Sequence, residues 1–139
     1  KKDLIVTAGG KNIAPQPIEN RVSGNPYVSQ VIMIGDRRSF PILVVVPEFA
    51  ALAAWASGNG IGFEGREDLV ANPKVVEFME HEILDSLGDL ARHERPKKLA
   101  LLPNELSLEN GEITPTLKVK RRVVEKRYRG IIDALYSET

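Results

Sequence analysis

The run of five apolar residues at positions 42–46 (ILVVV) constrains the fold of this chain more than any other feature. Because the run is continuous and does not alternate with polar residues, it is typical of a strand that is buried on both faces. A segment rich in β-branched residues precedes it at positions 28–34, and a polar loop at 35–39 joins the two. The sequence therefore predicts a hairpin whose second strand lies inside the core.

Helix signals surround this hairpin. Two prolines precede a short helix at residues 18–22, and Gly24 follows its end. A second helix is expected to begin at Pro47 and to stop at Gly58, before a glycine-rich connector. The longest helix opens at Asn72-Pro73 and is expected to run until Pro96. Its apolar stripe, at three- and four-residue spacing, consists of Val76, Met79, Ile83, Leu87 and Leu90.

The rest of the chain adds strands and a final helix. Residues 2–8 are expected to form an N-terminal strand, and residues 99–102 a third core strand. Asn110-Gly111 is a strong hairpin signal between the short segments 106–108 and 112–114. The final helix carries on one face Val124, Tyr128, Ile131, Ile132 and Leu135. The sequence therefore predicts an α+β domain: a roughly three-stranded mixed sheet covered by helices, plus an N-terminal two-stranded hairpin.

Composition and spacing exclude several functions. With 139 residues the chain is one domain, and a net charge of zero disfavours general nucleic-acid binding. The absence of cysteine excludes a disulfide framework, a thiol nucleophile and a cysteine-bound zinc. The glycines at 60–65 match a dinucleotide-binding pattern but follow a helix, where that pattern needs a strand, so a connector is expected. His81 has no second histidine at ligand spacing, so no metal site is predicted.

Two motifs stand at opposite ends of the chain. Residues 111–122 (GEITPTLKVKRR) place a turn, a proline-stiffened segment and a lysine directly before a basic helix. Within this stretch, TPTLKVKR at 114–121 resembles the last signature of the adenylate-forming acyl-CoA synthetases, in its long-chain form. KDLI at 2–5, followed by GGKNIAP at 9–15 and Ile18-Glu19, resembles the signature that opens the small C-terminal domain of the same family. The resemblance covers essentially the whole chain.

The resemblance implies that residues 1–139 are the mobile C-terminal lid domain of a long-chain fatty acid–CoA ligase. Such an enzyme uses ATP to convert a fatty acid into an acyl-adenylate and then transfers the acyl group to coenzyme A. Lys118 matches the catalytic adenylation lysine, and Lys2 matches the hinge between the two domains. Many family members have glycine where this chain has Leu117, and Lys120 therefore stays open as a competing assignment for the catalytic lysine.

The same resemblance implies a cofactor-binding loop and a set of partners. Gly9, Gly10 and Lys11 would form the loop that faces the pantetheine arm of coenzyme A. The partners would be the N-terminal domain of the same protein, ATP, a long-chain fatty acid and coenzyme A, without nucleic acid. Mg²⁺ would accompany ATP outside this domain. The isolated domain is expected to be inactive, and the location cytoplasmic, with peripheral membrane contact as an option.

Two alternatives stay open at this point. Within the enzyme class, the chain could come from a fatty acyl-AMP ligase or an adenylation module that hands the acyl group to a carrier protein. In a different class, it could be a non-enzymatic module whose basic segment, with seven basic residues and one acid at 118–129, docks on an anionic membrane or nucleic acid.

Overall fold

The computed structural model describes residues 3–137 and contains a larger and a smaller sheet. The larger one has the strand order β3–β4–β5, formed by β3 (Val28–Ile34), β4 (Ile42–Pro47) and β5 (Lys98–Leu101). β3 pairs with β4 in antiparallel fashion, whereas β5 pairs with β4 in parallel. The smaller sheet is an antiparallel pair of β1 (Ile5–Val6) and β2 (Asn12–Ile13). The predicted α+β fold, with a mixed three-stranded sheet and an N-terminal hairpin, is confirmed.

The core is centred on β4, as the continuous apolar run predicts. Every residue of β4 is buried, and Ile42, Leu43 and Val45 have no exposed surface. Because β4 has a partner strand on each side, its backbone N–H and C=O groups find partners within the sheet. A strand satisfied in this way can bury both faces without leaving polar groups unpaired.

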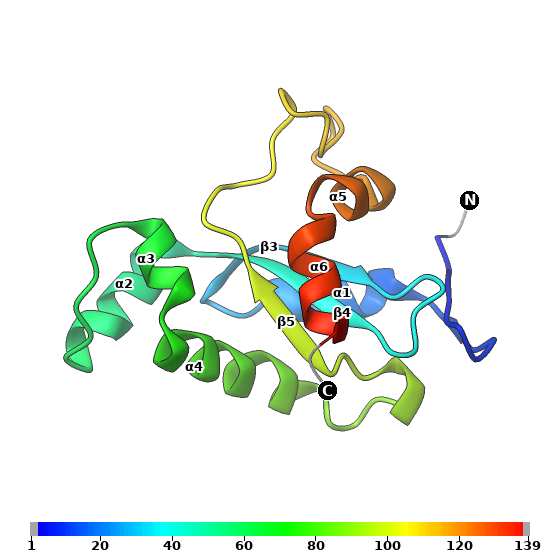
Figure 1. Ribbon diagram of the computed structural model, residues 1–139, viewed down its shortest axis with the longest axis horizontal. Helices are drawn as coiled ribbons and strands as arrows, with labels where there is room; N and C mark the ends of the chain where they lie inside the picture. Colours follow the sequence, from blue (N-terminus) through cyan, green and yellow to red (C-terminus); the bar gives the residue numbers. More distant parts are fainter. Residues whose placement is uncertain (1–2, 138–139) are drawn as a thin grey trace.

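Helices cover both faces of the larger sheet (Figure 1). α1 (Pro15–Ser23) packs against β3, and α4 (Pro73–Leu84) packs against β5. α5 (Arg121–Arg127) also packs against β3, and α6 (Arg129–Ser137) against β5. In Figure 1, α6 lies in front of the sheet and α1 behind it. The two faces are therefore closed by segments from opposite ends of the chain.

Between β4 and α4 the chain forms two helices where one was predicted. α2 (Phe49–Gly58) ends at the predicted glycine. The glycine-rich connector follows it, and then α3 (Arg66–Ala71) precedes α4. α3 was not predicted, because a helix of one and a half turns has too few residues to show an apolar period. Its buried residue is Leu69.

The longest helix is shorter than predicted. α4 ends at Leu84, well before Pro96, and two 3-10 turns follow it, η1 (Asp85–Leu87) and η2 (Arg92–Glu94). The Ser86 hydroxyl donates to a backbone carbonyl one turn earlier, a competition with the helix that the apolar period did not reveal. The buried stripe is Val75, Met79, Ile83 and Leu87, with Val75 in place of the predicted Val76.

The predicted single final helix is also wrong, because α5 and α6 are separated by a break at Tyr128 (φ −108°, ψ 27°). The Tyr128 hydroxyl donates to the buried carboxylate of Glu112, and this contact fixes the ring at the break. Gly130 lies two residues later, at the start of α6, and adds a weak helix former next to the break. The final segment therefore changes direction before it crosses the sheet (Figure 1).

Two predicted strand segments differ as well. Gly111 forms the expected turn with φ 73°, but segments 106–108 and 112–114 do not pair as strands. Ile113 instead forms an isolated bridge with Val119 across the following loop. Near the N-terminus, β1 occupies only part of the predicted strand at 2–8. The expected hinge residue Lys2 lies outside the described residues.

Candidate functional site

The loop that carries Lys118 is a tight hairpin, and not the extended segment that the sequence suggests. Ile113 pairs with Val119 at its base. The Thr114 N–H donates to the Lys118 carbonyl (2.8 Å), and the Leu117 N–H donates to the Thr114 carbonyl (2.8 Å). The Lys118 N–H donates to Thr114 Oγ1 (3.0 Å). The backbone of Lys118 is therefore held at both its N–H and its carbonyl group.

The Lys118 side chain is exposed, and no residue in the range 3–137 pairs with its ammonium group. It lines a cavity of about 180 Å³ between its own loop and α1, together with Leu117 and Asn20. Lys120, the competing lysine, is exposed as well, but it immediately precedes α5 and its N–H donates to the Glu112 carbonyl (2.8 Å). The structure thus presents Lys118 as a solvent-facing cation on a fixed backbone.

Leu117, directly before this lysine, has an unusual backbone conformation. Its φ is 68°, in the left-handed region, where a side chain costs about 1–2 kcal/mol and glycine costs nothing comparable. The side chain is also 74% exposed, so packing within the described residues does not compensate for the strain. A glycine at this position would adopt the same conformation without that cost.

The loop at Thr7–Lys11 repeats the Thr114–Lys118 loop bond for bond. The Thr7 N–H donates to the Lys11 carbonyl (2.9 Å), and the Gly10 N–H donates to the Thr7 carbonyl (2.9 Å). The Lys11 N–H donates to Thr7 Oγ1 (3.1 Å). Gly10 stands at φ 81°, in the position that Leu117 occupies in the other loop. The two sequence motifs at the ends of the chain are therefore built as the same threonine-to-lysine hairpin loop.

A basic cavity of about 420 Å³ opens beside the first of these loops, next to Thr7 and Gly9. None of its lining residues is acidic, and they include His93 and four cationic side chains, Lys11, Arg92, Arg95 and Lys97. Residues 92–95 fall within the long helix that was expected to run until Pro96, so no site was predicted there, and the structure instead places 92–94 in η2. The run RHERPKK at 92–98 was the available signal, but only the fold shows that it meets the Gly9 loop.

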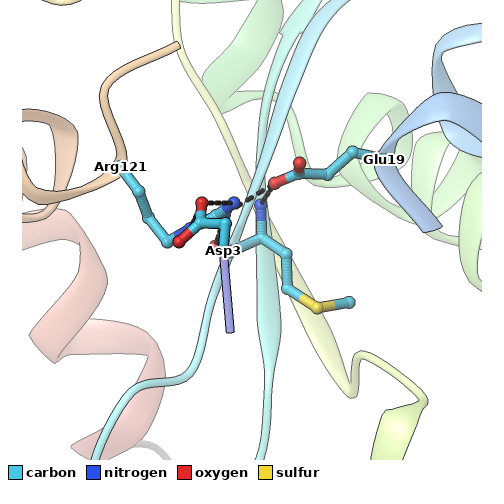
Figure 2. A network of polar contacts seen from close by, with 4 residues as sticks. Asp3, Glu19 and Arg121 are labelled. Atoms are coloured by element: carbon cyan, nitrogen blue, oxygen red, sulfur yellow. Dashed lines mark hydrogen bonds and ion pairs between the residues drawn. The ribbon is translucent and has the colours of Figure 1, made fainter. Parts of the chain in front are cut away.

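Arg121, the first residue of α5, connects this helix to α1, to β3 and to the N-terminal segment at Asp3 (Figure 2). Its guanidinium binds Glu19 on α1 (2.6 Å), Asp3 (2.7 Å) and the carbonyl of Met33 on β3 (2.5 Å). Glu19 also accepts a hydrogen bond from the Met33 N–H (2.6 Å). Burial opposes the charge on Arg121, but its bonds to Glu19 and Asp3 outweigh burial and raise the pKa of the guanidinium. The start of α5 is thereby fixed to α1 and to the sheet.

Glu112 anchors the other side of the hairpin that carries Lys118. Its side chain is wholly buried, and it accepts hydrogen bonds from the Ser107 N–H (2.8 Å) and the Tyr128 hydroxyl (2.5 Å). It also forms an ion pair with Arg127 (3.0 Å). Burial of the ring, and then the bond to Glu112, raise the pKa of Tyr128. A buried carboxylate with several partners is costly to disturb, so the base of the hairpin is rigid.

The remaining candidates from the sequence lie away from this site. The 60–65 glycines form the connector between α2 and α3. His81 pairs with Asp85 on the surface (3.0 Å), and the bond to Asp85 raises the pKa of the imidazole. Within residues 3–137 there is no group of three or more histidine, aspartate or glutamate side chains that could hold a metal ion. No helix in this range is long and apolar enough to cross a membrane.

Comparison with known proteins gives one family match. Residues 2–59 match the model of the AMP-binding enzyme C-terminal domain. Over 99% of its length, the chain is 31% identical to the long-chain-fatty-acid–CoA ligase FadD15 of Mycobacterium tuberculosis. Over the same share it is 36% identical to the human long-chain-fatty-acid–CoA ligase 1. The chain spans 23% of the length of the first relative and 20% of the second.

Solved structures show the same fold. The adenylation and carrier didomain of carboxylic acid reductase from Segniliparus rugosus, in complex with AMP, matches 99% of this chain with a TM-score of 0.69 and 25% identity. The match covers 18% of that protein chain. The adenylation domain of a carboxylate reductase from Mycobacterium chelonae matches 97% of this chain and 19% of its own, with a TM-score of 0.71 and 23% identity.

Proposed function

The chain belongs to the C-terminal domain family of the AMP-binding enzymes, and from this premise we propose that it is the mobile lid of a long-chain fatty acid–CoA ligase. The enzyme joins a fatty-acid carboxylate to the α-phosphate of ATP, with release of pyrophosphate, and the thiol of coenzyme A then displaces AMP. The observation that carries the proposal is the exposed ammonium of Lys118, with which no residue in the range 3–137 pairs, on a backbone held by Thr114 next to the buried Glu112 and Arg121.

Lys118 would act in the first half-reaction through electrostatics. A carboxylate and a phosphate repel each other as they approach, and an ammonium between them offsets the negative charge that gathers there. The charge helps only if it is already in place, which is what a loop held at both ends provides. A lysine suits this task because its compact charge has three donors for oxygens from two different groups.

Gly9, Gly10 and Lys11 would act in the second half-reaction. Among residues 3–137, an added Cβ at Gly9 meets nothing within 4 Å beyond its chain neighbours, so this part of the chain leaves space above the loop for a ligand. The adjoining cavity, with its four lysine and arginine side chains, suits the phosphate groups of coenzyme A, while the pantetheine arm would pass over the glycines. The two lysine loops would thus serve the two half-reactions in turn.

The N-terminal domain would supply what these residues do not. It would hold ATP, the fatty acid and the Mg²⁺ that accompanies ATP, because the described part of the chain offers no carboxylate cluster for a metal. Lys2, as the hinge, would absorb the backbone rotation between the two orientations of the lid. The 139-residue chain alone would therefore not turn over substrate. A cytoplasmic location, with peripheral contact to a membrane, belongs to the same proposal.

Separate assays of the two half-reactions test the role of Lys118 in the full-length enzyme. Lys118→Ala should lower the rate of acyl-adenylate formation by about a hundredfold to a thousandfold, the effect of removing one preorganised charge-stabilising donor. Thioester formation from supplied acyl-adenylate should stay within about twofold of wild type. Lys120→Ala is the matched control and should leave both rates nearly unchanged. An equal loss in both half-reactions, or a larger loss for Lys120→Ala, would contradict the assignment.

A carrier protein is the second candidate for the acyl acceptor, and one observation favours it. The carboxylic acid reductase structure that this fold matches includes a carrier domain next to its adenylation domain. The long-chain CoA ligases, at 31% and 36% identity, favour coenzyme A. Competition between coenzyme A and a carrier protein for one pool of acyl-adenylate separates the two: the proposal expects the thioester of coenzyme A to form first.

A further inference from the structure

Leu117 combines two features that are hard to reconcile with a purely structural role. Its backbone is in the left-handed region at φ 68°, and 74% of its side chain is exposed. A strained residue in a folded protein is usually held there by surrounding contacts or retained for a function. Within residues 3–137, the hydrogen bonds of the loop backbone hold this conformation, and packing of the exposed side chain does not.

The loop at Thr7–Lys11 shows which residue the hydrogen-bonded loop needs at the position of Leu117. The same hydrogen-bonded loop at Thr7–Lys11 has Gly10 at the equivalent position, with φ 81°. Glycine adopts this conformation without a steric penalty, so the loop has no need of a side chain there. The leucine side chain therefore contributes something other than loop stability.

The surroundings of Leu117 indicate what that contribution is. Leu117 and Lys118 line one cavity, and the exposed Leu4 lines a second cavity of about 390 Å³. The two cavities share Asp3 and residues of α1, so Leu4 and Leu117 flank one continuous surface. Phosphate groups near Lys118 would offer an aliphatic side chain no favourable contact. An apolar protein surface next to the phosphate site would offer the leucine a favourable contact, because the contact would remove its side chain from water.

On the basis of the function proposed above, we propose that Leu117 is a positioning residue for adenylation. Its side chain inserts into the surface of the N-terminal part of the full-length protein when Lys118 reaches the α-phosphate. The chain spans only 18–23% of the matched ligases and reductases, so a large remainder of such a protein is available as the partner. The contact exists in one lid orientation only, and it therefore favours that orientation over the other.

The test uses the full-length enzyme with three substitutions. Leu117→Asn keeps a side chain and tolerates the left-handed region, Leu117→Gly removes the side chain, and Leu117→Met keeps it apolar. Leu108→Asn is the matched control, because Leu108 is an exposed leucine that lines neither cavity. The readouts are the rates of both half-reactions at saturating substrate, the KM for ATP and the thermal unfolding midpoint.

Leu117→Asn and Leu117→Gly should lower the adenylation rate constant by about tenfold, equivalent to about 1.4 kcal/mol. The KM for ATP and the rate of thioester formation should stay within about twofold. The unfolding midpoint should not fall, because both changes relieve backbone strain. Leu117→Met should retain most of the adenylation rate, and Leu108→Asn all of it.

Wild-type adenylation in both Leu117→Asn and Leu117→Gly, in an enzyme that Lys118→Ala disables, would overturn the inference and leave the proposed function intact. An equal decline in both half-reactions would also overturn it, since that result indicates general damage. Failure of Lys118→Ala to impair adenylation would instead remove the proposed function itself. The two ideas therefore fail in different experiments.

Discussion

Removal of the Arg121 guanidinium should destabilise this domain more than removal of either carboxylate that it binds. Arg121 is 10% exposed in its side chain, Glu19 is 13% exposed, and Asp3 is 44% exposed. Arg121→Met keeps the apolar stem but deletes every bond of the guanidinium to Glu19, Asp3 and the Met33 carbonyl (Figure 2). The nearly buried Glu19 carboxylate then loses its counter-charge.

The magnitude follows from the burial of each partner. Loss of one partner of a buried ion pair costs about 3–5 kcal/mol. The lower end applies to Arg121→Met, because Glu19 keeps its bond from the Met33 N–H and some contact with water. Glu19→Gln should cost only about 1–2 kcal/mol, since Arg121 keeps its other acceptors. Asp3→Asn removes an exposed pair, which contributes less than about 1 kcal/mol.

Urea unfolding of the 139-residue chain at neutral pH measures these differences in unfolding free energy. The variants should shift the urea midpoint and leave the m-value, the slope of free energy against urea concentration, unchanged. The double substitution Arg121→Met with Glu19→Met should be less destabilising than Arg121→Met alone, because it leaves no unpaired buried charge. High salt should erase the small effect of Asp3→Asn and leave that of Arg121→Met.

Equal costs for Arg121→Met and Asp3→Asn would refute this reasoning, because they would mean that burial does not govern the strength of the network. A double substitution that is more damaging than Arg121→Met would refute it as well. In that case the contribution of Glu19 would come from packing and not from its charge.

Three further predictions concern Gly9 and Gly10 in the first lysine loop and Glu125 on α5. Gly9→Val should leave the unfolding free energy almost unchanged, because a Cβ there meets nothing within 4 Å among the described residues, but it should slow thioester formation selectively in the full-length enzyme. Gly10→Ala should lower the unfolding free energy by about 1 kcal/mol, because the backbone of Gly10 is in the left-handed region at φ 81°. Burial, and then the negative charge of Asp36, raise the pKa of Glu125 above its ordinary value of 4.5. The stability that accompanies protonated Glu125 is present below that value and is lost as pH rises through the raised pKa. Glu125→Gln should therefore be more stable than wild type at neutral pH and equal to it below pH 4.5 in thermal unfolding, whereas a difference confined to acid pH would contradict the assigned sign.

The elements that the sequence predicts well are those in which local pattern and tertiary burial agree. The apolar run at 42–46 is the buried central strand, and Pro73 does begin the long helix. The helix ends were less predictable, because apolar period alone cannot detect competition from a side chain such as Ser86. The break at Tyr128 depends on a hydrogen bond to Glu112, which is distant in sequence and carries no local signal.

The candidate site divides in the same way. The roles of Lys118 and Gly9-Gly10 remain predictions from a motif resemblance, and spacing along the chain did not show that their loops share one hydrogen-bond pattern. Arg121 is visible in the sequence as one of seven basic residues at 118–129, yet its partner Glu19 lies about a hundred positions away. The cationic cavity likewise requires residues 92–97 to meet the loop at residue 9. Contacts between distant segments are set by topology, and only the folded chain displays them.

The attachment of both lysine loops to the larger sheet limits how the proposed lid can change between the two half-reactions. The loop of Lys11 is tied to the turn between β3 and β4, because the Ala8 N–H donates to the Arg38 carbonyl (2.8 Å). The loop of Lys118 is tied to the buried Glu112 and, through Arg121, to β3. Both loops are therefore fixed to the same three-stranded sheet. An exchange of one lysine for the other at a single reaction centre must come from rotation of the whole domain, since neither loop can move without breaking the hydrogen bonds and ion pairs that attach it to the sheet.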